Sequence, residues 1–294
     1  MHFVNAKTIL SAKPCGMNIY RGCSHGCIYC DSRSKCYQFT HAFEDIEVKQ
    51  NAPELLAEAL RKKRRRCIIG TGSMCDPYIP QEKELCLMRR CLEVIDRYDF
   101  GAAVLTKSDL VLRDLDILER INRKTKAVVQ MTLTTADDNL CRLVEPVVCP
   151  TSRRFEVLCE CKKLGIPTVV WFSPLLPFIN DTKENVDGIL DYCIRADVKA
   201  ILCFGIGLTL REGNREYFYA ALDRLASRHS QFENLKERYI RTYGNSYMIS
   251  SQNENTLMAH ISQVCKRNNI MLGGESVFKW IEGFSEDSLQ PSLF

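Results

Sequence analysis

Short apolar runs alternate along the chain with longer segments in which apolar residues recur at helical spacing. The runs predict strands, and the amphipathic segments between them predict helices. For example, Leu85, Met88, Leu92 and Ile95 form one stripe of a predicted helix. The predicted strands are residues 17–20, 67–72, 101–106, 127–133, 168–173 and 200–205, and the predicted helices between them are residues 53–65, 81–97, 109–122, 151–164 and 182–196.

Six alternating units of strand and helix predict an α/β fold, in which helices surround a parallel sheet. If such a sheet curves round without closing completely, it forms a partial (β/α)6 TIM-like barrel. Three further helices are expected at 214–229, 232–240 and 253–268, packed against the open side or the bottom of the barrel. We therefore expect one domain over residues 1–294, with a barrel core at about 15–210 and a helical C-terminal tail at about 211–294.

The composition agrees with a large packed core and argues against several classes of protein. Of the 294 residues, 46% are hydrophobic, yet no apolar run is long enough to span a bilayer. The first residues lack the basic and apolar segments of a secretory signal. The sixteen cysteines therefore indicate a reducing compartment, and we expect a cytoplasmic protein.

The net charge of +4 decides nothing by itself. The basic run at 61–66 could contact phosphate, but it falls at the end of a predicted helix, where cations also complement the helix dipole. That end lies away from the strand C-termini, where barrel enzymes carry their chemistry. We interpret the run as a solvated helix end.

Residues 21–30 contain three cysteines, Cys23, Cys27 and Cys30, at C-x3-C-x2-C spacing. Structural zinc takes four protein ligands, and a fully ligated iron–sulfur cluster also takes four cysteines. A cubane cluster that is held by only three cysteines has one iron free to bind a small molecule. Gly22 and Gly26 allow a loop of this kind to curl around a bulky cluster.

Two other interpretations of this loop remain open. It could be a zinc knuckle, with His25 or Cys36 as the fourth ligand. The three thiols could also be ordinary buried residues, because free cysteine packs as a small hydrophobic side chain.

Tyr29 completes the pattern C-x3-C-x-aromatic-C, which resembles the radical S-adenosylmethionine (SAM) superfamily. The order and spacing of several later stretches resemble the spore photoproduct lyase-related group of that superfamily. These stretches are 18–23, 76–82, 106–108 with 113–114, 143–146, and 174–177 with 180–181.

The resemblance implies a barrel of the radical SAM type, with Cys23, Cys27 and Cys30 as ligands of a [4Fe–4S] cluster. It also implies reductive cleavage of SAM to a 5′-deoxyadenosyl radical that abstracts hydrogen from a substrate, with electrons from an external flavodoxin- or ferredoxin-type reductant. The substrate is expected to be a nucleic-acid base, as in a photoproduct lyase, or a peptide or metabolite. A non-catalytic zinc-binding module is the alternative from another class.

The resemblance, combined with position relative to the strands, implies further contacts to SAM. Tyr29 would border the adenine or be simple core, and small residues after the second strand would let backbone approach the methionine amino group. Hydroxyls after the third and fourth strands would reach the ribose or carboxylate. Lys107 would pair with the SAM carboxylate, with a substrate anion, or with Asp76 or Asp109. The predicted cofactor-binding residues are Tyr29, Gly70, Thr71, Gly72, Ser73, Thr106, Lys107, Ser108 and Thr132.

Cys75 is a candidate catalytic residue. In spore photoproduct lyase a cysteine near the end of the second strand returns a hydrogen atom to the product, three residues before an aspartate. Here Cys75 directly precedes Asp76, and Ser73 occupies the comparable place. Cys75 could still face the site, because residues two apart in an extended segment point the same way.

Overall fold

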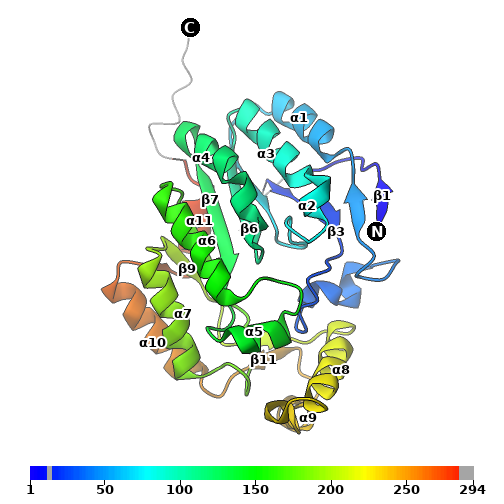
Figure 1. Cartoon of the computed structure of the whole chain (residues 1–294), viewed down its shortest axis with the longest axis vertical. Helices are drawn as coiled ribbons and strands as arrows, with labels where there is room; N and C mark the ends of the chain where they lie inside the picture. The colour runs from blue at the N-terminus through cyan, green and yellow to red at the C-terminus, as the bar shows by residue number, and fades with distance from the viewer. Residues whose placement is uncertain (12–14, 285–294) are drawn as a thin grey trace.

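The computed structural model describes residues 1–11 and 15–284, and its centre is a seven-stranded sheet (Figure 1). Every neighbouring pair in this sheet is parallel, so the predicted parallel α/β fold is confirmed. In spatial order the strands are β12 (Met271–Leu272), β9 (Ala200–Leu202), β8 (Thr168–Trp171), β7 (Ala127–Thr132), β6 (Gly101–Thr106), β5 (Ile68–Thr71) and β2 (Gly16–Met17).

Helices follow the strands as expected and cover the outer face of the sheet (Figure 1). They are α1 (Ala52–Lys62), α2 (Glu82–Leu85), α3 (Leu87–Arg97), α4 (Leu115–Lys124), α5 (Asp138–Val144), α6 (Thr151–Lys163) and α7 (Lys183–Arg195). The C-terminal part adds α8 (Asn214–Ala226), α9 (Leu235–Tyr243), α10 (Glu254–Arg267) and α11 (Gly274–Glu282). The short 3-10 helices of the described chain are η1 (Asp31–Arg33), η2 (Lys35–Tyr37), η3 (Asp109–Asp114) and η4 (Ser230–Phe232).

Both faces of the sheet are buried, which explains why the strands read as continuous apolar runs. Residues such as Ile69 and Val129 pack against the outer helices, whereas their neighbours Ile68 and Val128 face the interior of the half-barrel. The interior layer packs against α11 through its buried Val277 and Ile281, and the side chains of this layer are Ile68, Ala103, Val128, Val169, Ala200 and Leu202. Helix α11 therefore fills the interior of the half-barrel.

Contacts of Lys126 place the C-terminal end of α11 at the end of the barrel where the strands begin. Lys126 directly precedes β7, and its ammonium lies 4.1 Å from the ring centroid of Trp280 and donates to the Gly283 carbonyl at 2.8 Å. The N-terminal part of α11 lies toward the opposite end, where Phe278 contacts Phe204 just after β9. Among the described residues, no helix combines the length and hydropathy that a membrane span requires.

Several predicted elements differ from the structure. The first strand is β2 at 16–17, and Tyr20–Arg21 instead forms β3, which pairs with β4 (Glu47–Lys49) beside β1 (His2–Val4) in a separate sheet. The helix predicted at 81–97 is interrupted at Cys86, whose φ is 49°. The helix predicted at 109–122 begins as the 3-10 helix η3. Hydrophobic patterning also did not predict α5, α11, β12 or the strand pair β10 (Gly207–Thr209) and β11 (Met248–Ser250).

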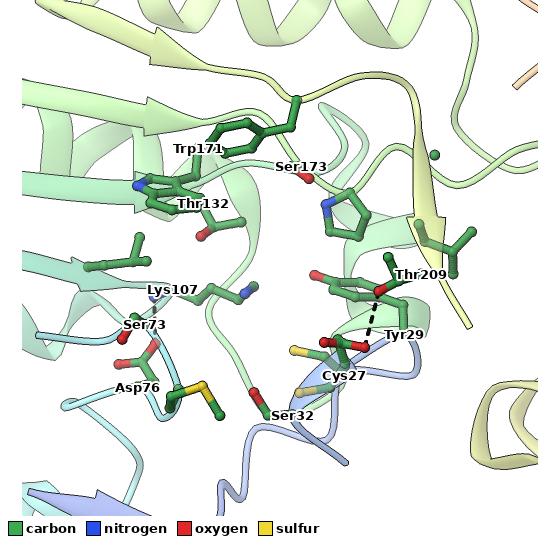
Figure 2. Close-up of a pocket in the computed structure, with 18 of the residues that line it drawn as sticks. Cys27, Tyr29, Ser32, Ser73, Asp76, Lys107, Thr132, Trp171, Ser173 and Thr209 are labelled. Carbon is green, nitrogen blue, oxygen red and sulfur yellow. Dashed lines mark hydrogen bonds between the residues drawn. The ribbon is translucent and has the colours of Figure 1, made fainter. Parts of the chain in front are cut away.

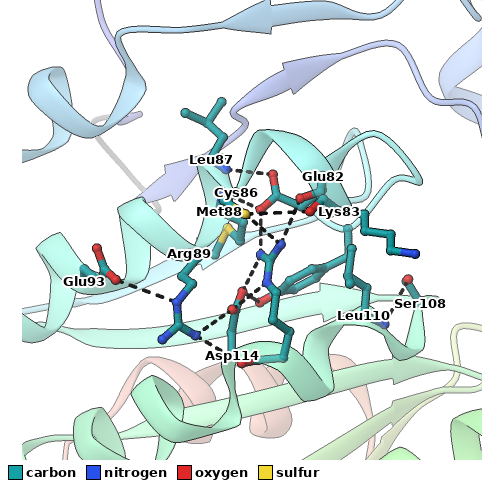
Figure 3. Close-up of polar contacts among 12 residues, drawn as sticks. Glu82, Lys83, Cys86, Leu87, Met88, Arg89, Glu93, Ser108, Leu110 and Asp114 are labelled. Carbon is teal, nitrogen blue, oxygen red and sulfur yellow. Dashed lines mark hydrogen bonds and ion pairs between the residues drawn. The ribbon is translucent and has the colours of Figure 1, made fainter.

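A buried polar network around Glu82 and Asp114 (Figure 3) joins the second and third units, and Tyr20 connects it to β3. Glu82 accepts hydrogen bonds from the backbone N–H groups of Leu87 and Met88, both at 3.0 Å, so it caps α3 after the interruption at Cys86. The same carboxylate pairs with Arg113 at 2.7 Å and accepts from the hydroxyl of Tyr20. Because Tyr20 lies three residues before Cys23, this network positions the start of the cysteine loop.

Candidate functional site

A cavity of about 470 Å³ opens at the C-terminal ends of the strands (Figure 2). Its walls come from the cysteine loop, from the residues that follow β5 to β9, and from the strand pair β10–β11. In TIM-type barrels this end of the sheet carries the chemistry. Predicted site residues that line it are Cys23, Cys27, Tyr29, Cys30, Gly72, Ser73, Cys75, Thr106, Lys107 and Thr132.

The cysteine loop is held by backbone contacts on both of its sides. The N–H of Cys23 donates to the carbonyl of Phe43 at 3.2 Å, and the N–H of Ile28 donates to the carbonyl of Val144 at 3.0 Å. Gly22 has a φ of +90°, and a Cβ there would lie 2.5 Å from the Phe43 oxygen. Only glycine therefore fits this close approach of the two backbones.

The spread of the three thiols fits a cluster better than a single zinc ion. Tetrahedral zinc with Zn–S bonds of about 2.3 Å requires sulfurs about 3.8 Å apart. Among the described residues, the group of metal-ligand atoms that lie within 4.8 Å of one another is on β1 and near β4, and it includes no cysteine of this loop. At least one pair of loop thiols is thus further apart than a mononuclear site requires.

Neither candidate for a fourth zinc ligand completes the loop. His25 is buried and its Nδ1 lies 3.5 Å from the carboxylate of Asp76. Cys36 is exposed, and its sulfur accepts from Arg211 at 3.3 Å. Among the described residues, neither candidate belongs to a group of three close metal-ligand atoms with the loop thiols, so the geometry favours the three-cysteine interpretation over the zinc knuckle.

Burial and neighbouring groups set the protonation of the loop thiols. Burial raises the pKa of the Cys27 and Cys30 thiols, whereas a hydrogen bond from the Cys75 thiol holds the pKa of Cys23 well below its usual range. Metal ions bind the thiolate form and displace the proton. A bound cation would therefore be the natural counter-charge for this buried loop.

Lys107 reaches into the cavity from the end of β6 (Figure 2). Burial disfavours its charge, but the fields of Cys27 and Glu145 outweigh this effect and raise the pKa of the ammonium. Neither predicted salt-bridge partner is available: Asp109 pairs with Arg153 at 2.9 Å, and Asp76 accepts the backbone N–H of Lys107 at 2.7 Å. Among the described residues, no carboxylate lies within ion-pair distance of the Lys107 ammonium.

Asp76 fixes the end of β6, a positioning role that the sequence did not indicate. It accepts from the Thr106 hydroxyl at 2.7 Å as well as from the backbone of Lys107. The Thr106 oxygen in turn accepts from the N–H of Ser108 at 2.9 Å. Thr106 lines the cavity, but its hydroxyl is already engaged, so its role is to hold the strand end.

Three predicted cofactor-binding residues lie outside the cavity wall. Thr71 alternates with Gly70 and shares the outer, helix-covered face with Ile69. Gly70 faces the interior, with no atom near the position of a Cβ, yet does not line the cavity. Ser108 caps η3 by accepting from the N–H of Leu110 at 3.2 Å.

Gly72, by contrast, has a structural requirement at the cavity wall. Its φ is +97°, and a Cβ would lie 2.0 Å from the carbonyl oxygen of Leu105. This contact lets the segment after β5 approach β6 closely, and it brings Ser73 to the cavity.

Cys75 is buried at the cavity wall, and its thiol donates to the carbonyl of Gly22. The thiol is thus within hydrogen-bonding reach of both the Gly22 carbonyl and the Cys23 sulfur, and its single proton can serve one of them at a time. A role as hydrogen donor stays a prediction.

Tyr29 belongs to a buried network, and its ion pair between Glu145 and Arg154 was not predicted from the sequence. The Tyr29 hydroxyl donates to the carboxylate of Glu145, which pairs with Arg154 at 2.5 Å. Arg154 is fully buried and donates to the carbonyls of Thr132 and Cys149, both at 3.0 Å. Arg154 and Lys107 outweigh the effect of burial and lower the pKa of Glu145. The network ties the cysteine loop to the end of β7.

Aromatic side chains form another wall of the cavity that the sequence did not predict. Trp171 ends β8, and its ring centroid lies 5.8 Å from that of Phe204, which follows β9. Phe278 of α11 stacks on Phe204 at 6.2 Å with an interplanar angle of 19°. Trp171 (Figure 2) and Phe204, which is 58% exposed, line the cavity, whereas Phe278 packs on Phe204 without lining it.

Uncharacterized proteins from other organisms are similar in sequence to a large part of this chain. The chain is 29% identical over 219 residues to an uncharacterized protein of Mycobacterium tuberculosis, and the aligned part is 71% of this chain and 62% of that protein. It is 31% identical over 169 residues to an uncharacterized protein of Methanocaldococcus jannaschii, with 57% of this chain and 62% of that protein aligned. The chain thus spans less than two thirds of the length of these relatives.

The fold is similar to that of spore photoproduct lyase complexed with a dinucleoside spore photoproduct. The TM-score is 0.64 at 15% identity, and the match covers 92% of this chain and 80% of that chain. Another spore photoproduct lyase structure, a mutant with bound SAM and the dinucleoside photoproduct, matches with the same TM-score at 14% identity. The resemblance to this group is thus confirmed at the level of the fold.

The family profile described as the Radical SAM superfamily matches residues 17–193, more than half of the chain. This span contains the cysteine loop, Lys107 and the ends of strands β5 to β8, which line the cavity. The superfamily uses a [4Fe–4S] cluster and SAM. On the family profile, the cysteine loop and the fold together, the chain belongs to the radical SAM superfamily.

Proposed function

We propose that this radical SAM enzyme binds its cluster through Cys23, Cys27 and Cys30 and its SAM in the adjoining cavity. When bound, the two cofactors supply a 5′-deoxyadenosyl radical that abstracts hydrogen from the substrate. The observation that carries the proposal is that three loop thiols and the Lys107 ammonium, which has no carboxylate partner among the described residues, face one cavity at the strand C-termini. The wide spacing of the thiols supports a cluster rather than zinc.

In this proposal Lys107 binds the SAM carboxylate, because its ammonium has no carboxylate partner in the described chain. The residues 72–73 present backbone to SAM, and Thr132 and Tyr29 border it. Electrons come from an external flavodoxin- or ferredoxin-type protein in a reducing, cytoplasmic environment, which also keeps the sixteen cysteines reduced.

Replacing Lys107 by Met is expected to weaken SAM binding by about 10- to 150-fold, since a charge-assisted hydrogen bond contributes roughly 1.5–3 kcal/mol. Lys107→Arg keeps the charge and is expected to recover part of the affinity. The measurement is the Kd of SAM for anaerobically reconstituted protein. Lys163→Met is the matched control, because Lys163 is exposed on α6 and pairs only with Glu160 among the described residues. An unchanged Kd in Lys107→Met contradicts the assignment.

We propose a nucleic-acid base as the substrate. The aromatic cluster of Trp171, Phe204 and Phe278 supports this class, because every base has a flat face and stacking on an aromatic side chain contributes about 1–3 kcal/mol. The exposed face of Phe204 at the cavity gives an unstacked base a surface close to the cofactor site. The fold shared with spore photoproduct lyase adds support by analogy.

The test uses reconstituted protein with SAM and dithionite, and the product measured is 5′-deoxyadenosine. Short single-stranded oligonucleotides, with and without ultraviolet irradiation, are expected to stimulate its formation, whereas unrelated peptides are not. Phe204→Ala is expected to raise the KM for the oligonucleotide by about 5- to 100-fold through lost stacking. The control Ile240→Ala removes an apolar side chain that is 46% exposed on α9. Stimulation by peptides alone would overturn the substrate class but leave the enzyme class intact.

A further inference from the structure

Two histidines and a glutamate meet away from the cavity, on β1 and near β4. One ligand atom from each of His2, His41 and Glu47 lies within 4.8 Å of the others. The parallel register of β1 and β4 places His2 directly opposite Glu47. Side chains in such a pair project from the same face of the sheet. The ring of His41 completes the group, with its centroid 4.9 Å from that of His2.

Each histidine ring has one nitrogen already engaged. Nδ1 of His2 lies 3.0 Å from the carboxylate of Asp45, and Nδ1 of His41 lies 2.9 Å from the carbonyl of Ala42. Because these oxygens accept hydrogen bonds, both Nδ1 atoms carry the proton in the neutral rings. The lone pair of each histidine is then on Nε2. This arrangement is typical of metal-binding histidines, whose second nitrogen donates to a carboxylate or a backbone carbonyl.

The acceptor atoms of this group lack protein donors in the described part of the chain. Nε2 of His41 is buried and makes no hydrogen bond there. Glu47 forms no ion pair with any described residue. One ring nitrogen of each histidine and one carboxylate oxygen thus lie close together. The buried Nε2 of His41 is the kind of polar atom that is normally satisfied. A cation would satisfy all three at once.

We propose that His2, His41 and Glu47 bind a divalent transition-metal ion. Two imidazole nitrogens and a carboxylate form a known ligand set for zinc and for iron(II), with the remaining positions open to solvent. Bonds of about 2.0–2.1 Å to a tetrahedral zinc require donors about 3.3 Å apart. The observed limit of 4.8 Å leaves only small side-chain movements to reach this geometry.

The ion would brace the segment that supports the cysteine loop. β4 pairs antiparallel with β3, and the register places Glu47 opposite Arg21, two residues before Cys23. The carbonyl of Phe43, between His41 and Glu47 in the chain, accepts from the N–H of Cys23. A metal at this site therefore ties β1 and the 41–47 segment together behind the loop, independently of the chemistry in the cavity.

The experiment uses untagged protein with its cluster reconstituted, equilibrated with zinc and freed of excess metal by dialysis. We expect one zinc per chain in addition to the cluster iron, and a zinc-dependent rise in Tm. His41→Ala and the near-isosteric Glu47→Gln are expected to lose the zinc and the Tm shift while keeping the iron. His229→Ala is the matched control and is expected to keep both, since His229 packs near Phe232 away from this group.

Equal zinc in wild type, His41→Ala and Glu47→Gln would overturn the proposal, as would an anomalous scattering peak for zinc at any other residues. If His41→Ala lowers the iron content as well, Glu47→Gln decides, because it changes one ligand atom and hardly changes the packing. If zinc occupies the cysteine loop instead, the measured iron content will fall below four atoms per chain.

Discussion

Alanine at Cys23, Cys27 or Cys30 is expected to abolish the visible absorption of the reconstituted cluster and to reduce SAM cleavage to background. The three thiols line one cavity on a loop that is held at both sides by backbone hydrogen bonds. With only two thiolates left, the cluster loses a protein ligand, and the loop offers no replacement, because the Cys36 sulfur is exposed and bound to Arg211. Iron content, the absorption spectrum and 5′-deoxyadenosine formation are the measurements.

Cys36→Ala and Cys159→Ala serve as matched controls, because each removes one thiol outside the cavity wall. Both are expected to keep full iron content and full SAM cleavage. Four irons per chain in Cys27→Ala, or stoichiometric zinc and no iron in the anaerobically purified wild type, would contradict the assignment of the loop.

Arg154→Met is expected to lower the free energy of unfolding by about 3–5 kcal/mol, because it leaves the carboxylate of Glu145 buried without its partner. Both side chains of the pair are fully buried. The double variant Glu145→Leu with Arg154→Met removes both charges and is expected to recover much of the loss. Urea denaturation of the variants measures these differences.

Arg123→Met is the control, since Arg123 pairs with Glu119 on the surface of α4 and such pairs contribute well under 1 kcal/mol.

The free energy of unfolding is expected to depend on pH through Glu145, and the direction of this dependence follows from its pKa. The pKa of Glu145 is lowered in the fold, so its contribution is present above the ordinary value of 4.5 and is lost as the pH falls through the lowered pKa. A double variant no more stable than Arg154→Met would show that packing, not charge, explains the loss.

The sheet could be predicted because each of its central strands is buried on both faces. Such a strand is a continuous apolar run, which can be recognised from a few consecutive residues. The edge strand β12 was missed and β2 was misplaced, since two-residue strands carry no periodicity. The interruption at Cys86 could not be predicted either: α2 and α3 share one helical stripe, and the break depends on Glu82, which caps the second helix. Contacts between residues distant in sequence thus determine these features, which periodicity alone does not predict.

The candidate site likewise has parts that could be predicted from the sequence and parts that could not. Cysteine spacing is a property of ten consecutive residues, and Lys107 follows a clear strand, so both were accessible from sequence. The engagement of Thr106 by Asp76 joins residues thirty apart, and nothing in either segment indicates it. The partner of Glu145 likewise became evident only when α6 brought Arg154 beneath the cysteine loop. The aromatic wall required the packing of α11.

Helix α11 has a consequence for biosynthesis. The interior layer of the half-barrel is complete only when Val277 and Ile281 are in place, and these follow the last residue of β9 by more than seventy positions. When the ribosome has released all the strands from β2 to β9, it has therefore not yet released α11, which covers their inner face. During that interval the apolar inner surface is open to water and to chaperones, and truncation before 274 would make this state permanent.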